Sequence, residues 1–169
     1  SIKIWSAGCA NGEEPYSLAI ILKHLLTASG ANFNVQIFAT DVDKKSMELA
    51  QKAEYGKDSL KNTDKKFLEK YFDYNGRLYR VKDEIKNMVT FQTLDLTSQD
   101  FIPDADVVIC RNVFIYFDRD LQEQLLMKFY KSLKPNGYMI MGKAETLINE
   151  ARQIFSDIDF DARIYMKKQ

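Results

Sequence analysis

The sequence has two cysteines, one histidine and no excess of charge of either sign. Two cysteines are too few for a disulfide framework, which favours a reducing compartment such as the cytoplasm. Lysine plus arginine equals aspartate plus glutamate at 24 each, so the overall charge gives no reason to expect nucleic acid as a partner. No apolar run approaches bilayer length and no signal peptide precedes the first apolar segment, so we expect no membrane insertion.

The composition is that of a globular protein. With 169 residues, 46% of them hydrophobic and 12% aromatic, the chain has enough material for one domain with a substantial core. It starts directly on an apolar segment that is typical of a core strand. We therefore expect that an N-terminal region has been lost.

The rest of the chain is organised around its opening stretch, residues 2–17, which reads IKIWSAGCANGEEPYS. A short apolar run ends in small residues, passes two glycines four positions apart, and continues into a helical pattern. This is how a strand-turn-helix unit of a nucleotide-binding α/β sheet begins. Gly8 and Gly12 carry no Cβ, so the backbone can turn tightly and approach a ligand closely.

Two acids make this turn a poor site for phosphate. It lacks a P-loop lysine, and Glu13 and Glu14 occupy the place where a pyrophosphate needs bare amides and positive charge. Two carboxylates repel a phosphate and attract a cation, so they favour a cofactor with a nucleoside and a positively charged group. S-adenosylmethionine fits both requirements. The alternative is that the two acids merely complement the start of a helix.

Strands and helices alternate along most of the chain, which predicts a doubly wound α/β sheet. We expect strands at 3–7, 35–40, 89–94, 106–110 and 138–142, a last strand within 160–168, and helices at 14–26, 44–53 and 120–133. The pattern breaks between residues 55 and 84. There we expect a short helix around 64–71 and a hairpin at 71–81 with a two-residue Asn75-Gly76 turn. Together they predict a small antiparallel insertion at about 67–88.

Ligands of open α/β sheets bind at the carboxyl ends of the strands. Those ends gather residues 6–12, Asp41, 95–96 and 110–112. We assign Asp41 to the ribose hydroxyls of a nucleoside and Asp43 to the cap of the following helix, although either acid could serve as the cap. No metal-ligand cluster is among these residues. The sole histidine, His24, lies away from them and is interpreted as a surface or packing residue.

The lack of histidine at this edge narrows the chemistry. Taking a proton from a neutral nucleophile usually requires a base that titrates near neutrality. Methyl transfer from a sulfonium to a carboxylate does not, because a carboxyl group with a pKa of about 4.3 is already ionised. Arg111 could orient that carboxylate and Tyr116 could line the methyl channel. The structural alternatives are an ion pair of Arg111 with Asp118 or Asp41, and packing of Tyr116 beneath the next helix.

Several motifs closely resemble the chemotaxis receptor methyltransferases, the CheR family. In chain order they are WSAGC with GEEPYS (5–9 and 12–17), ATDVD (39–43), CRNVFIYF (110–117), GKAE (142–145) and IYMK (164–167). Their order and spacing make the resemblance specific, and it covers essentially the whole chain. It implies a Rossmann-like class I methyltransferase fold. It also implies methylation of glutamates on the cytoplasmic helices of chemoreceptors, with S-adenosylmethionine as cofactor and S-adenosylhomocysteine as product.

By motif match, the resemblance implies a set of site residues. Glu14, with or without Glu13, and Asp41 would bind the methionine and ribose parts of the cofactor, and Asp95-Leu96 would lie at the adenine. Cys110-Arg111 would lie at the sulfonium end, and Arg111 and Tyr116 nearest the methyl acceptor. The full cofactor-binding set is Ala7, Gly8, Glu13, Glu14, Asp41, Asp95, Leu96, Cys110 and Arg111.

The chain also departs from the family. Asp95 stands where asparagine is common and Lys143 where histidine is frequent. We also expect that these 169 residues do not include the family's helical N-terminal domain. Members that bind a receptor's C-terminal pentapeptide resemble one another in a longer, glycine-containing hairpin loop than the one at 73–77 here. We therefore expect a pentapeptide-independent protein.

Two other functions stay open. One is a module that binds the cofactor or its product without turnover, which Arg111 and Tyr116 argue against. The other is a related methyltransferase that acts on a different protein. A nucleoside-diphosphate oxidoreductase is disfavoured by the acids in the first turn. For Cys9 and Cys110 we expect two free, half-buried thiols rather than an oxidation-sensitive pair.

Overall fold

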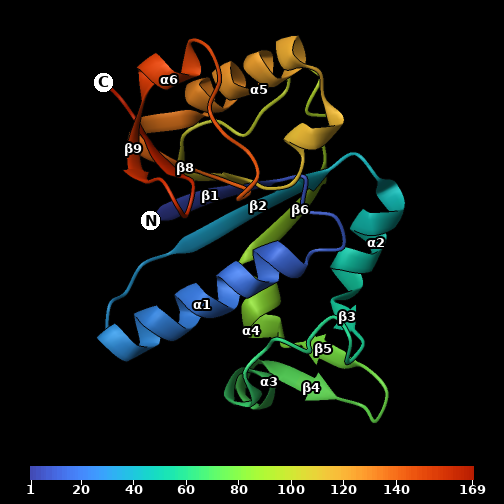
Figure 1. Ribbon diagram of the computed structural model, residues 1–169. Coiled ribbons are helices and arrows are strands. Elements are labelled where there is room, and N and C mark those ends of the chain that lie inside the picture. Colours follow the sequence, from blue (N-terminus) through green and yellow to red (C-terminus); the bar gives the residue numbers. More distant parts are fainter.

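The computed structural model describes all 169 residues and is built on a seven-stranded sheet in the order β6-β2-β1-β7-β8-β10-β9 (Figure 1). The strands are β1 (Ile2–Ala7), β2 (Val35–Asp41), β6 (Val89–Thr93), β7 (Ala105–Cys110), β8 (Leu133–Met141), β9 (Phe155–Asp159) and β10 (Ile164–Lys167). The strands from β6 to β8 run parallel, and β10 runs antiparallel to both β8 and β9. The strand order reverses between β1 and β7, as in Rossmann-like folds.

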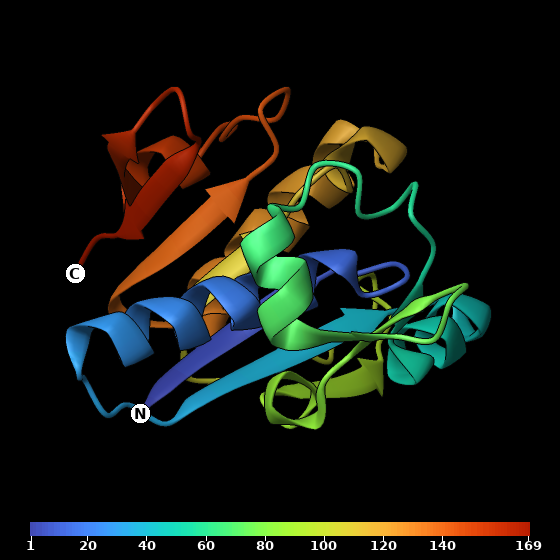
Figure 2. The same cartoon turned by 90° about the horizontal axis from the view of Figure 1, so that it is seen from below.

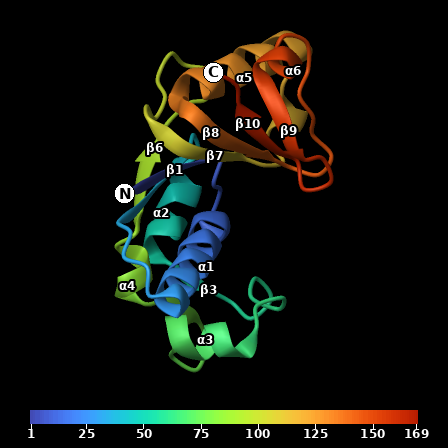
Figure 3. The same ribbon diagram turned by 90° about the vertical axis from the view of Figure 1, so that its left-hand side faces the viewer.

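Helices cover both faces of this sheet. They are α1 (Glu13–Ser29), α2 (Lys44–Lys52), α3 (Lys65–Tyr71), α4 (Asp83–Lys86), α5 (Arg119–Ser132) and α6 (Ala151–Ile154). Figure 3 shows α5 and α6 on one side of the sheet and α1, α2 and α4 on the other. The predicted doubly wound α/β fold is confirmed. None of the helices is both long and apolar enough to cross a bilayer.

Each face of the sheet has its own hydrophobic core, because neighbouring strand residues point to opposite sides. In β1, Trp5 packs toward α5, where its ring meets Phe129 edge-on at 5.2 Å, while Ile4 belongs to the core under α1. In β7, Val108 and Ile109 divide in the same way. These buried strands are therefore apolar on both faces, as their nearly continuous apolar sequence predicts.

A second, three-stranded antiparallel sheet lies below α1 and α2 in Figure 1, in the order β3-β5-β4. Its strands are β3 (Glu54–Tyr55), β4 (Phe72–Tyr74) and β5 (Tyr79–Val81). The antiparallel insertion is confirmed, but β3 was not predicted. A pair of residues is too short to show any periodicity. The same sheet and the segment that leads into it are seen from below in Figure 2.

The hairpin between β4 and β5 corrects the predicted two-residue turn. Tyr74 pairs with Tyr79, so the loop between them has four residues, 75–78. The Asn75 side chain closes this loop by accepting hydrogen bonds from the backbone amides of Arg77 at 3.0 Å and Leu78 at 2.8 Å. The asparagine therefore acts through its carboxamide, in the manner of an Asx turn, rather than as half of a tight Asn-Gly turn.

The C-terminal strands also differ from the prediction. Strand β8 begins at Leu133, immediately after α5, and not at Tyr138. The register with β7 shifts within this stretch, where Asn136 has φ of 61°. In addition, the tail forms two strands, β9 and β10, where one was expected. From Asp157 onward every residue of β9 is exposed, whether polar or apolar, so hydrophobic patterning gives this strand little signal.

His24 is a packing residue, as predicted: its ring meets that of Phe67 edge-on at 5.2 Å. Both cysteines are free, as expected, but they are fully buried and not half-buried. Burial raises the pKa of the Cys9 thiol to about 12 and that of Cys110 well above its ordinary value.

Candidate active site

The turn between β1 and α1 is held in left-handed backbone conformations. Gly8 has φ of 76°, Ala10 of 46° and Gly12 of 86°. A Cβ on Gly8 would lie 2.5 Å from Cγ2 of Val113, and one on Gly12 would lie 2.8 Å from the Ala50 Cβ. Glycine is therefore required at both positions for two reasons: the backbone has a positive φ there, and there is no space for a Cβ. The turn packs directly against the loop that follows β7.

Asp41, at the end of β2, ties this turn to the sheet. One of its carboxylate oxygens accepts from the Ala10 amide at 2.8 Å and the other from the Asp43 amide at 3.0 Å. Each oxygen thus retains a lone pair for a further donor, such as a ribose hydroxyl. Asp43 caps α2 by accepting from the amides of Lys45 and Ser46, so the prediction for Asp43 is confirmed.

Glu14 and Arg111 meet where the strand order reverses, between the ends of β1 and β7. The Arg111 guanidinium lies 3.6 Å from one Glu14 carboxylate oxygen, and the Ser6 hydroxyl donates to the other at 2.9 Å. Burial raises the pKa of Glu14, while Ser6 and Arg111 oppose that rise. Arg111 therefore pairs with neither Asp118 nor Asp41, the structural partners considered from the sequence.

Glu13 does not share this position. Its side chain is exposed, and it lines a separate cavity of about 300 Å³ between α1 and residues 59–67. Ala7 and Cys110 are completely buried, so they lie beneath the site and offer no surface to a ligand in this structure. The structure brings together Gly8, Glu14, Asp41 and Arg111. Glu13, Ala7 and Cys110 lie outside this group.

Asp95 and Leu96 follow β6 and lie at the same edge of the sheet, where the parallel strands end. The Asp95 carboxylate accepts from the backbone amide and the hydroxyl of Thr97, both at 2.8 Å, and these bonds lower its pKa. The Leu94 amide donates to the Asp41 carbonyl at 3.0 Å, which fixes this segment beside the end of β2. Leu96 itself is buried.

Lys128, which the sequence reasoning missed, supports this segment from α5. Its ammonium donates to the carbonyls of Leu96 and Ser98, and burial lowers its pKa. A lysine within an amphipathic helix is usually on the solvated face, so the sequence carried no signal for this role.

Glu145 is the second residue that the sequence reasoning missed, and it shapes the loop after β7. Its carboxylate, only 6% exposed, accepts four backbone hydrogen bonds. The donors are the amides of Asn112 at 3.0 Å, Val113 at 2.9 Å, Phe114 at 2.9 Å and Gly142 at 2.8 Å. Its motif, GKAE, was noted for its resemblance alone, and nothing local reveals a partner more than 30 residues away.

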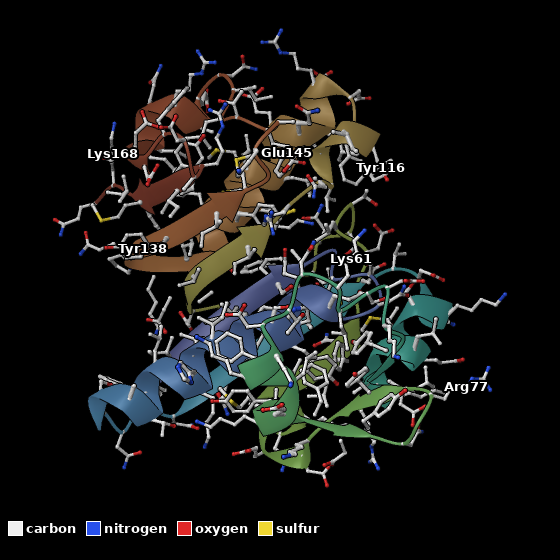
Figure 4. All side chains as sticks on the ribbon, turned by 60° about the horizontal axis from the view of Figure 1, so that its bottom comes forward. Lys61, Arg77, Tyr116, Tyr138, Glu145 and Lys168 are labelled. Carbon is white, nitrogen blue, oxygen red and sulfur yellow. The ribbon has the colours of Figure 1, made fainter.

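Tyr116 lies on the single 3₁₀ turn η1 (Phe114–Tyr116) that follows this loop, and it reaches outward (Figure 4). It is 79% exposed, so the alternative that it packs beneath the next helix is wrong. Phe114 is the residue of this turn that enters the core. Arg111 is half-exposed at the start of the same loop, and both side chains are therefore accessible to a substrate.

The fold is that of S-adenosylmethionine-dependent methyltransferases. A putative O-methyltransferase from Nostoc punctiforme aligns with a TM-score of 0.54 at 17% identity, over 83% of this chain and 32% of that one. PKMT2 from Rickettsia typhi, in complex with AdoHcy, aligns with a TM-score of 0.50 at 18% identity, over 83% and 20%. At such identities the likeness establishes the fold alone.

The sequence comparisons give the family. Residues 1–164 match the family described as CheR methyltransferase, SAM binding domain. The chemotaxis protein methyltransferase of Borreliella burgdorferi is 38% identical over 149 residues, 86% of this chain and 53% of that protein. Those of Salmonella typhimurium and Escherichia coli are 36% and 35% identical, each over 89% of this chain and 54% of the relative. The chain belongs to the CheR methyltransferase family, as its S-adenosylmethionine-binding domain, and spans about half the length of these relatives.

Proposed function

We propose that this chain is the catalytic domain of a protein-glutamate O-methyltransferase in chemotaxis signalling. It would transfer the methyl group of S-adenosylmethionine to glutamate side chains on the cytoplasmic helices of chemoreceptors, and so act in the cytoplasm. The observation that carries the proposal is the Glu14–Arg111 pair at the strand reversal, in a chain of this family. It combines an acid that suits a cationic cofactor with a half-exposed guanidinium that suits a carboxylate substrate.

The residues at this edge fit the cofactor chemically. The Glu14 carboxylate is half-buried and matches the α-ammonium of the methionine part, while the free lone pairs of Asp41 match the ribose hydroxyls. Asp95 and Leu96 lie next along the edge and would hold the adenine. Because the first turn is acidic rather than cationic, it discriminates against cofactors bound through a pyrophosphate.

The chain's own residues would then position the acceptor. When bound, the cofactor supplies an electrophilic methyl group on a sulfonium. A glutamate carboxylate is ionised at neutral pH, so no base has to remove a proton. Arg111 has five N–H donors, enough to hold that carboxylate while it stays beside Glu14. The sulfonium would supply the methyl group to an acceptor oxygen and keep the electron pair of its broken carbon–sulfur bond, while Arg111 would hold the acceptor carboxylate in place. No proton moves.

Calorimetric titration with S-adenosylmethionine and S-adenosylhomocysteine tests the cofactor assignment. We expect the full-length protein to bind both, and Asp41→Ala to lose most of that affinity. Asp43→Asn is the matched control, since asparagine also caps helices and Asp43 faces α2 rather than the site. Failure of the full-length protein to bind either compound would end the methyltransferase proposal. Binding without methylation of any receptor fragment would favour a binding module or another protein substrate.

The proposal includes independence from a receptor's C-terminal pentapeptide. It is supported by the four-residue loop between β4 and β5, which the Asn75 side chain closes on itself. Such a loop offers little free backbone for pairing with an added peptide strand. Titration of the folded protein with the pentapeptide should show no binding at micromolar concentrations, and clear micromolar binding would overturn this part.

A further inference from the structure

Two large apolar side chains are exposed to solvent in the loop that carries the proposed acceptor site. Ile115 is 65% exposed and its neighbour Tyr116 is 79% exposed, and both lie on η1. Arg111 begins the same loop and contacts Glu14. Scattered exposed apolar residues need no explanation, but two adjacent ones next to a proposed reaction site are candidates for a contact surface.

The backbone that presents these two side chains is tied down from both sides. Glu145 accepts the amides of Asn112, Val113 and Phe114 on the inner side. From α5, the Gln122 side-chain amide donates to the carbonyls of Phe114 at 2.9 Å and Phe117 at 3.0 Å. Phe114 anchors the turn in the core. A contact surface that is already ordered loses little conformational entropy when it binds, which is how preorganisation raises affinity.

We propose that Ile115 and Tyr116 form an apolar knuckle that packs on the protein substrate next to the acceptor glutamate. This inference rests on the proposed function, and its occupant is an amphipathic helix that carries the acceptor. On such a helix, side chains three or four positions apart are neighbours about 5–6 Å apart. With the acceptor carboxylate at Arg111, an apolar side chain one turn away would face Ile115, which lies four positions further along the same loop. Arg111 thus selects the carboxylate, and the knuckle selects which glutamate along the helix is presented.

Ile158 provides a matched control. It is another exposed isoleucine, at 51%, but it lies on β9 at the far edge of the sheet. Ile115→Ser and Ile158→Ser therefore remove the same side chain at similar exposure, one beside Arg111 and one away from it. Neither side chain belongs to a core cluster, so both variants should fold.

The experiment measures initial rates of methyl transfer by the full-length protein to a chemoreceptor helical hairpin. We expect Ile115→Ser to raise KM for the hairpin about tenfold, as truncation of a central contact residue does. The dissociation constant for S-adenosylhomocysteine should stay within about twofold, because the knuckle lies on the acceptor side. Ile158→Ser should match the unmodified protein in both measurements. On a hairpin whose apolar residue one turn from the acceptor is replaced by serine, the unmodified protein and Ile115→Ser should have the same KM.

Three outcomes would overturn the proposal. The first is an unchanged KM in Ile115→Ser. The second is an equal rise of KM in Ile158→Ser, which would show a general surface effect. The third is a dimer in sedimentation that Ile115→Ser dissociates, which would make a second copy of the chain the occupant. In each of these cases cofactor binding and methylation by the unmodified protein would still stand, so failure of the knuckle is distinguishable from failure of the proposed function.

Discussion

Glu14 combines an energetic cost to the fold with the cofactor-binding role that we propose for it. Its side chain is 26% exposed and partly removed from water, which disfavours the charged form, and only Ser6 and Arg111 compensate. A carboxylate held in this state gains from a cationic ligand more than an exposed one does, because the ligand's charge acts in a less polar environment. The raised pKa is thus the sign of an incomplete charge pairing that a bound ammonium group would complete.

Replacing Glu14 by glutamine should reveal this cost as a function of pH. The folded pKa of Glu14 is raised, so below its unfolded pKa the group is protonated in both states and costs nothing. As pH rises through the folded pKa, the native state must ionise a buried group, and stability is lost. We expect the free energy of unfolding of Glu14→Gln, relative to that of the unmodified protein, to increase from acid toward neutral pH. We also expect the variant to bind S-adenosylhomocysteine more weakly than the unmodified protein does.

Denaturant unfolding at a series of pH values, with binding followed by calorimetry, measures both effects. Glu48→Gln is the control, because Glu48 is an exposed acid on α2 away from the site. Replacing it should leave the affinity for S-adenosylhomocysteine unchanged. A stability difference for Glu14→Gln that does not vary with pH would mean that the burial of the Glu14 carboxyl is relieved in solution.

At the scale of elements, the loop after β7 depends on a residue that follows the end of β8. Each Glu145 carboxylate oxygen accepts hydrogen bonds from two backbone amides, so one side chain accepts from all four. Asn112 holds φ of 60° within this loop. The loop's shape is therefore imposed by tertiary hydrogen bonds and not by local preference.

Glu145→Gln should destabilise this loop without changing the size of the side chain. A carboxamide replaces one acceptor oxygen by a donor, which leaves two of the four amides facing a hydrogen-bond donor. We expect a loss of roughly 2 kcal/mol or more in the free energy of unfolding, since buried donors left without partners each cost about 1–3 kcal/mol. One of the two pairs of amides, Val113 with Phe114 or Asn112 with Gly142, should therefore exchange hydrogen faster, by a larger factor than the β1 amides.

Glu123→Gln is the comparison for this prediction. Glu123 accepts one exposed hydrogen bond, from the Asn149 side chain at 2.9 Å, so its replacement should cost little. Equal exchange rates in the two variants at all four amides that Glu145 accepts would show that Glu145 does not hold the loop.

Whether a feature was predicted or missed depends on how far apart in the sequence its interacting residues lie. The parallel strands and the long helices were predicted because burial on one or two faces leaves a periodic pattern in the chain. Strand β3, the early start of β8 and the four-residue loop at 75–78 are short or set by partners distant in sequence. The same holds for the site: Asp41 and Arg111 follow strands and were predicted, whereas Glu145 and Lys128 act through long-range contacts to backbone.

At the scale of the whole molecule, the two cysteines report on how the fold opens. Cys9 lies in the turn after β1 with Ala39 and Met47, and Cys110 lies in the larger core under α5. The thiolate is the reactive form, and burial raises the pKa of Cys9 to about 12 and that of Cys110 well above its ordinary value. Neither thiol can react until the structure around it opens.

Thiol labelling near pH 8 should therefore be slow in the native protein and fast in denaturant. A ligand that binds only the folded state lowers the open population by the factor 1 + [L]/Kd, so S-adenosylhomocysteine at a hundred times its Kd should slow labelling about a hundredfold. Single-cysteine variants, Cys9→Ala and Cys110→Ala, assign the two rates.

Equal protection of both thiols means that the sheet opens as one unit, because Cys110 lies beneath the site rather than in it. Protection of Cys9 alone means that the turn after β1 opens locally and that the ligand closes it. Rapid labelling of either thiol in the ligand-free native protein would contradict the burial on which both readings depend.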